Sequence, residues 1–115
     1  RDIADYRIGE LLSNAKVGAD GVWPCEGVRA VMDRLMTDSI SRGFYIGTKN
    51  SRGAHFRGEG GTQERELAAK YEGWASFMEY EYPNTATALR NIAESYASDA
   101  EYEDNEAAIR KRMRY

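Results

Sequence analysis

The stretch ERELAAKYEGWASFMEYEY, residues 64–82, decides the fold of this chain. Its large apolar side chains recur with the period of an α-helix and form one continuous stripe, made of Leu67, Tyr71, Trp74, Met78 and Tyr82. A helix of this length spans roughly 30 Å, at about 1.5 Å per residue. We therefore predict a helix over residues 62–82, with Thr62 as its N-cap and with Trp74 and Met78 in the core.

Pro83 separates this helix from the next one. Proline has no backbone N–H group and pushes the preceding residue, Tyr82, out of the α region, but it suits the first turn of a helix. Residues 83–112 again follow a helical period, and one face carries the side chains Leu89, Ile92, Ala93, Tyr96 and Ala100. Because the connection is so short, the two helices should pack as an antiparallel hairpin.

The N-terminal half of the chain predicts shorter helices on both sides of a turn-rich connection at residues 16–23. One of these helices has Thr37 or Asp38 as its expected cap. Gly43 and Gly47 lie four residues apart on that helix, which would let a partner helix approach closely. Alternating strand patterns are nearly absent, so the predicted fold class is all-α.

The composition fits one globular domain, because 42% of the residues are hydrophobic and 30% are charged. We predict a single helical domain over residues 1–115, a four- to five-helix bundle with a long C-terminal antiparallel helical hairpin. One cysteine and one histidine exclude an internal disulfide framework and argue against a Cys/His zinc site. No apolar run reaches the ~20 residues of a membrane span, and no signal peptide is visible. We expect a cytoplasmic protein without membrane contact, metal or cofactor.

The stretch GTKNSRGAHFRGEGG, residues 47–61, is rich in glycine and in basic side chains, and we expect a loop there. Lys49, Arg52, His55 and Arg57 are its candidate binding residues for a phosphate or a nucleic acid. The stretch is not a Walker motif, because no GK[ST] follows the glycines. The simpler alternative is a solvated loop whose basic residues pair with acids elsewhere in the chain. A third alternative is a small metal-independent ribonuclease with His55 as general acid or base.

Charge is segregated along the chain. Residues 39–58 carry four bases and no acid, residues 59–106 carry twelve acids against three bases, and the last nine residues carry four bases. Such segregation favours electrostatic complementarity with a partner.

No metal-ligand set, cofactor motif or convincing nucleophile arrangement is visible in the sequence. The leading hypothesis is therefore a non-enzymatic helical module for protein–protein interaction or assembly, which contacts a protein partner or a larger parent chain. Its expected contact surfaces are the basic loop and the acidic outer face of the last helix. The alternatives are nucleic-acid binding through loop 47–61 and the ribonuclease that uses His55.

Four segments carry a resemblance: VWPCEGVRAVMDRL (22–35), GFYIGTKNSRG (43–53), GGTQERELAAKYEGWA (60–75) and YPNTATALRNIAESYASDAEYED (82–104). Together they resemble a helical segment of uncharacterised actinobacterial proteins. The resemblance implies no activity and no catalytic residue. It does imply that the segment is the C-terminal part of a longer chain, which agrees with a first residue, Arg1, that is not methionine.

Overall fold

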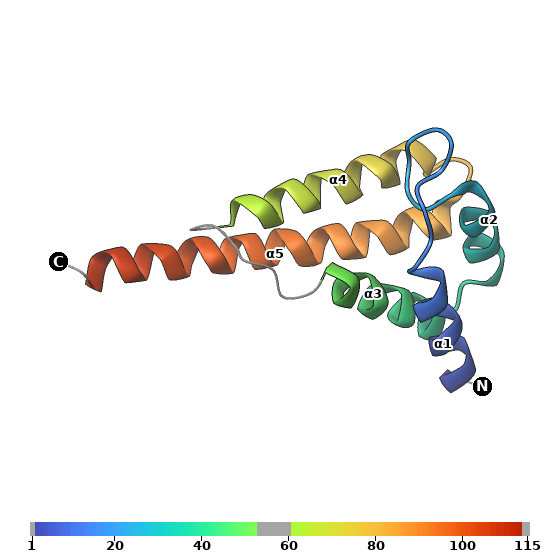
Figure 1. Ribbon diagram of the computed structural model, residues 1–115, viewed down its shortest axis with the longest axis horizontal. Helices are drawn as coiled ribbons and strands as arrows, with labels where there is room; N and C mark the ends of the chain where they lie inside the picture. Colours follow the sequence, from blue (N-terminus) through green and yellow to red (C-terminus); the bar gives the residue numbers. More distant parts are fainter. Residues whose placement is uncertain (1, 53–60, 114–115) are drawn as a thin grey trace.

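The computed structural model describes residues 2–52 and 61–113. They form five α-helices and no strand: α1 (Asp2–Leu12), α2 (Glu26–Leu35), α3 (Asp38–Arg52), α4 (Thr62–Met78) and α5 (Pro83–Met113). The long helix α5 runs the length of the molecule, with α4 along one side of it and α3 along another (Figure 1). This arrangement confirms the all-α prediction and the C-terminal antiparallel hairpin.

The hairpin of α4 and α5 is held by the apolar stripes predicted from the sequence. Tyr71 and Met78 of α4 are fully buried, as are Leu89 and Ile92 of α5. Helix α4 ends at Met78 rather than at Tyr82, because residues 79–82 form the turn and the N–H of Tyr82 donates to the carbonyl of Met78 at 2.8 Å.

The N-terminus of α5 is capped from another helix. Pro83 has no N–H group, and the carboxylate of Asp33 in α2 accepts hydrogen bonds from the backbone N–H groups of Asn84 and Thr85, at 2.7 and 3.4 Å. The hydroxyl of Thr85 donates to the carbonyl of Arg29 at 3.0 Å. Helix α2 is thereby fixed against the closed end of the hairpin.

Aromatic rings join the N-terminal segments to the hairpin. Trp23, which precedes α2, stacks on Phe44 of α3 with ring centroids 5.3 Å apart, and it contacts the edge of Tyr71 at 5.7 Å. Tyr71 also lies 5.2 Å from Trp74 and stacks on Tyr96 of α5 at 5.8 Å. The predicted placement of Trp74 and Tyr96 in the core is confirmed, although Trp74 is only partly buried.

Helices α1 and α3 cross through their glycines. A β-carbon on Gly43 would overlap the carbonyl oxygen of Tyr6, and one on Gly9 would lie 2.7 Å from the backbone nitrogen of Phe44. Gly47 lies against Ser13 in the same way. The predicted close approach at Gly43 and Gly47 is therefore confirmed, and α1 is the helix that approaches.

A buried arginine orders the connection between α1 and α2. The side chain of Arg29 is 4% exposed and donates to both carboxylate oxygens of Asp20, at 2.8 and 2.9 Å. It also donates to the carbonyls of Val22 and Pro24. The bonds from Arg29 to the carboxylate, followed by the one from the Val22 N–H, lower the pKa of Asp20 from 3.8 to about 2.

Two sequence-based boundaries at the ends of the 47–61 stretch were wrong. Helix α3 continues to Arg52, so residues 47–52 are helical and not part of a loop, because Thr48 is buried and Gly47 packs on α1. Thr62 is the first helical residue of α4, and Gly61, which packs against the backbone of Ala100, is its N-cap. The other cap prediction is confirmed, since the Thr37 hydroxyl accepts from the N–H of Ile40 at 3.1 Å.

Candidate interaction site

Lys49 is the one predicted binding residue whose side chain the structure describes, and its ammonium group is used within the fold. Its Nζ donates to Asp99 of α5 at 2.7 Å and to the Ser95 hydroxyl at 2.8 Å. The same Nζ lies 4.0 Å from the centre of the Tyr96 ring, which adds a cation–π contact. For Lys49, the structure matches the alternative in which a basic residue of the stretch pairs with an acid elsewhere.

The other three predicted binding residues cannot be placed beside Lys49. Arg52 ends helix α3, and nothing is described of its side chain; His55 and Arg57 lie outside the described residues. Nucleic-acid binding through this stretch and the ribonuclease with His55 therefore stay predictions.

Acidic side chains of α5 also form ion pairs and hydrogen bonds within the chain. Asp104 accepts from the backbone N–H of Gly61 at 2.8 Å and from Arg65 of α4. These two bonds, the one from Gly61 first, lower the pKa of Asp104. Together with the contact of Lys49 with Asp99, they attach α5 to α3 and to the first turn of α4.

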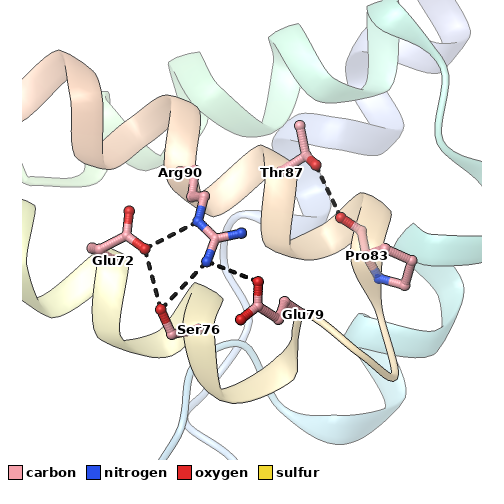
Figure 2. A network of polar contacts seen from close by, with 6 residues as sticks. All are labelled: Glu72, Ser76, Glu79, Pro83, Thr87 and Arg90. Carbon is pink, nitrogen blue, oxygen red and sulfur yellow. Dashed lines mark hydrogen bonds and ion pairs between the residues drawn. The ribbon is translucent and has the colours of Figure 1, made fainter.

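Arg90 makes a similar network near the closed end of the hairpin. Its guanidinium donates from α5 to Glu72, Ser76 and Glu79 of α4, at 3.0, 3.3 and 3.2 Å (Figure 2). Ser76 also donates to Glu72 at 3.2 Å. This surface network ties the two helices together, and it leaves these charges engaged within the chain.

Beyond Asp104, helix α5 extends past the first turn of α4, as its last turns in Figure 1 show. All residues from Ala108 to Met113 are exposed. From Tyr102 onward, three large apolar side chains recur at helical spacing, and their exposed fractions are 63% for Tyr102, 45% for Ile109 and 81% for Met113. They form one stripe on the projecting end of α5.

Charge is arranged in two blocks around this stripe. Residues 101–106 contain four acids, and the last turn of the helix contains three bases, Arg110, Lys111 and Arg112. The bases complement the negative end of the helix dipole. The Tyr102 hydroxyl donates to Glu106 at 3.0 Å, and this hydrogen bond raises the pKa of Tyr102.

The predicted contact surfaces were the basic loop and the acidic outer face of α5, and the apolar stripe at the end of this helix was not predicted. The spacing of Tyr102, Ile109 and Met113 in the sequence could have predicted this stripe, but a buried helix face shows the same spacing. Exposed apolar side chains occur on α1 and α4 as well, among them Leu11 and Phe77. Those surfaces lack the two opposite charge blocks that make the end of α5 specific.

Neither a cluster of metal-binding side chains nor a membrane-spanning helix is found in the part of the chain that the structure describes. No group of three or more histidine, cysteine, aspartate or glutamate side chains is placed there to hold a metal ion. None of the helices in residues 2–52 and 61–113 has the length and apolar character needed to span a membrane.

Comparisons of the chain with protein-family models, with curated proteins and with solved structures found no match. The resemblance to actinobacterial helical segments therefore stays a prediction. Function has to be inferred from the chain's own residues.

Proposed function

We propose that this chain is a non-enzymatic helical assembly module, in which two copies pair antiparallel through the projecting ends of their α5 helices. The observation that carries the proposal is the exposed stripe of Tyr102, Ile109 and Met113 on that end. An apolar stripe at this spacing suits packing against another helix. Its burial would also stabilise the final turns of α5, because short helices without packing partners are marginal in water.

Charge selects the antiparallel orientation. A parallel pair would place the acids of residues 101–106 beside the same acids of the second copy. An antiparallel pair instead places them beside the bases of residues 110–112. The segment is then complementary to itself, as an interface with two-fold symmetry requires.

The spacing of the stripe sets the register of this pair. If Tyr102 packs against Met113 of the second copy, the two-fold axis passes between residues 107 and 108. A methionine sulfur then contacts an aromatic ring at both ends of the interface, which is a favourable contact. Glu103 lies within about two residues, roughly 3 Å along the helix axis, of the level of Arg110 of the second copy.

The pairing should be weak. The last three to four turns of two helices bury less than the roughly 1,200 Å² of a stable protein–protein interface. We expect a dissociation constant of tens of micromolar, or about 6 kcal/mol of binding free energy. Because the charges are exposed, the affinity should fall as salt is added.

Sedimentation velocity of the full chain over a wide concentration range tests the proposal. Two charge-swapped variants are compared: Arg110→Glu/Lys111→Glu/Arg112→Glu and Glu101→Lys/Glu103→Lys/Glu106→Lys. Each variant alone should stay monomeric because like charges meet, whereas an equimolar mixture should restore the dimer. Arg34→Glu, at an exposed position on α2, is the matched control and should dimerise like the unchanged chain.

Circular dichroism of each variant verifies that the helices are retained. A chain that stays monomeric up to about tenfold above the expected dissociation constant would refute the proposal. So would a dimer that survives in both charge-swapped variants separately, since its interface would lie elsewhere. A mixture that fails to associate would exclude charge as the determinant of the pairing.

A further inference from the structure

A cavity opens beside the aromatic core, between the connection that follows α1 and helices α3 and α4. Its volume is about 710 Å³. Small-molecule sites in proteins typically measure roughly 300–1,000 Å³. Both tryptophans of the chain, Trp23 and Trp74, line the cavity. Neither the apolar stripe nor the charge blocks at the end of α5 belong to it, so it is independent of the assembly surface.

The charge of the cavity is opposite to that of the chain. The chain has 19 acids against 16 bases, yet the described lining contains Lys16 and Lys70 and no acid. Lys70 Nζ lies 5.4 Å from the centre of the Trp74 ring, which holds an ammonium group beside the indole. A concave surface whose described lining has two ammonium groups and no carboxylate favours an anionic ligand.

The largest apolar side chains of the lining are aromatic, and the two tryptophans lie next to each other. Trp23 and Trp74 have centroids 5.8 Å apart and planes inclined by 42°. The Trp23 Nε1 donates to the carbonyl of Ala15 at 2.7 Å, so this indole is fixed in orientation. Indole faces of this kind suit a planar, apolar group.

One polar group in the lining lacks a partner. The Thr48 hydroxyl is buried and has no hydrogen bond to any residue that the structure describes. Its neighbours differ, because the hydroxyl of Ser51 donates to the Thr48 carbonyl at 2.8 Å and that of Ser13 donates to the Glu10 carbonyl at 2.5 Å. Buried polar groups are almost always hydrogen-bonded, so this unpaired hydroxyl is a donor in the lining that a ligand oxygen would satisfy.

We propose that this cavity binds a small molecule that joins a planar apolar ring to one anionic group, either a carboxylate or a phosphate. Lys16 and Lys70 neutralise the anion, the two indoles contact the ring, and the Thr48 hydroxyl donates to an oxygen of the ligand. Each half of this ligand corresponds to a different part of the lining. An uncharged ring would contact only the tryptophans, and an anion without a ring would contact only the lysines, so both should bind more weakly.

The two tryptophans report on this site directly, because the chain contains no others. The full chain is titrated with phenyl phosphate and with phenylacetate, under excitation at the red edge of tryptophan absorption. Benzyl alcohol and inorganic phosphate are the matched controls. We expect a saturable change in tryptophan emission with at least one of the two anionic rings, and at least about tenfold weaker binding of both controls. Binding of only one anionic ring identifies the anionic group as phosphate or carboxylate.

Three variants test the named residues. Lys16→Gln/Lys70→Gln should weaken binding of the anionic rings by at least about tenfold, whereas Lys111→Gln, on the distant end of α5, should leave it unchanged. Thr48→Val keeps the side-chain shape, so it should weaken ligand binding without lowering the free energy of unfolding in urea. No saturable emission change with either anionic ring overturns the proposal. Affinity that is unchanged in the double lysine variant, or equal for benzyl alcohol, overturns it as well.

Discussion

Replacing Gly73 and Gly43 separately by alanine should change the free energy of unfolding in opposite directions, although both glycines lie inside helices. Gly73 is exposed in the middle of α4, and a β-carbon there would meet no atom within 4 Å. Alanine should therefore stabilise the protein by about 1 kcal/mol, the difference in helix propensity.

Gly43 has the same local conformation but a different neighbour. A β-carbon there would overlap the carbonyl oxygen of Tyr6, and would lie 2.9 Å from its carbonyl carbon and 3.1 Å from the backbone nitrogen of Glu10. These are backbone atoms of α1, so no rotamer change can relieve the overlap, and α1 must move. Overpacking of this kind costs about 1–3 kcal/mol, and after subtraction of the propensity gain of about 1 kcal/mol the net loss is up to about 2 kcal/mol.

Urea unfolding followed by far-UV circular dichroism measures both changes on one scale. The two variants should differ by about 1–3 kcal/mol, with similar dependence of the free energy on urea. Gly9→Ala is a second test of the same crossing and should also destabilise, because its β-carbon would meet Ile40 and Phe44 of α3. If Gly43→Ala were as stable as Gly73→Ala, the close crossing of α1 and α3 would be refuted.

Three further changes test other parts of the fold. Leu89 is fully buried, so Leu89→Ala should lower the free energy of unfolding by about 2–5 kcal/mol. Ile109 is exposed on the projecting end of α5, so Ile109→Ala should change this free energy by less than about 0.5 kcal/mol. Urea unfolding of dilute protein measures both changes. Arg29 lowers the pKa of Asp20 from 3.8 to about 2, so the stability that this pair contributes is complete above pH 3.8 and is lost as the pH falls through 2. Acid unfolding followed by circular dichroism measures this loss, which should be smaller in Asp20→Asn. Arg90→Ala should destabilise the hairpin, and the difference from the unchanged chain should shrink in high salt, since Arg90 and its acidic partners are accessible to solvent; thermal melts at two salt concentrations measure this.

The hairpin could be predicted because its signals are local. The stripe from Leu67 to Met78 has helical spacing, and Pro83 both ends one helical pattern and begins the next. The ends of the helices were harder to predict. Glycine-rich composition suggested a loop from residue 47, but tertiary packing keeps the chain helical as far as Arg52. Burial of Thr48 and packing of Gly47 on Ser13 decide that boundary, and neither contact is visible in a local pattern.

The candidate site was harder to predict because its residues meet across long sequence distances. Lys49 bonds to Asp99, which lies 50 residues further along the chain, so the sequence shows a basic residue but not its neutralising partner. Trp74 was predicted as a core residue and Trp23 as the end of a turn-rich connection, and their common cavity depends on how that connection returns to α4. Local patterns identify the side chains available for such a site, but the fold decides which of them come together.

The charged segments show the same contrast between what the sequence offers and what the fold brings together. They also support the choice of the end of α5 as the contact surface. In the sequence, a basic segment, a long acidic segment and a basic terminus all look equally available to a partner. In the structure, Asp99 is engaged by Lys49, Asp104 by Arg65, and Glu72 and Glu79 by Arg90. The three bases at residues 110–112 lie beyond these pairs, on exposed turns that also carry Ile109 and Met113. In the proposed antiparallel pair, residues 101–113 of the second copy would supply both opposite charge for these bases and apolar cover for this stripe, so one surface would satisfy both requirements.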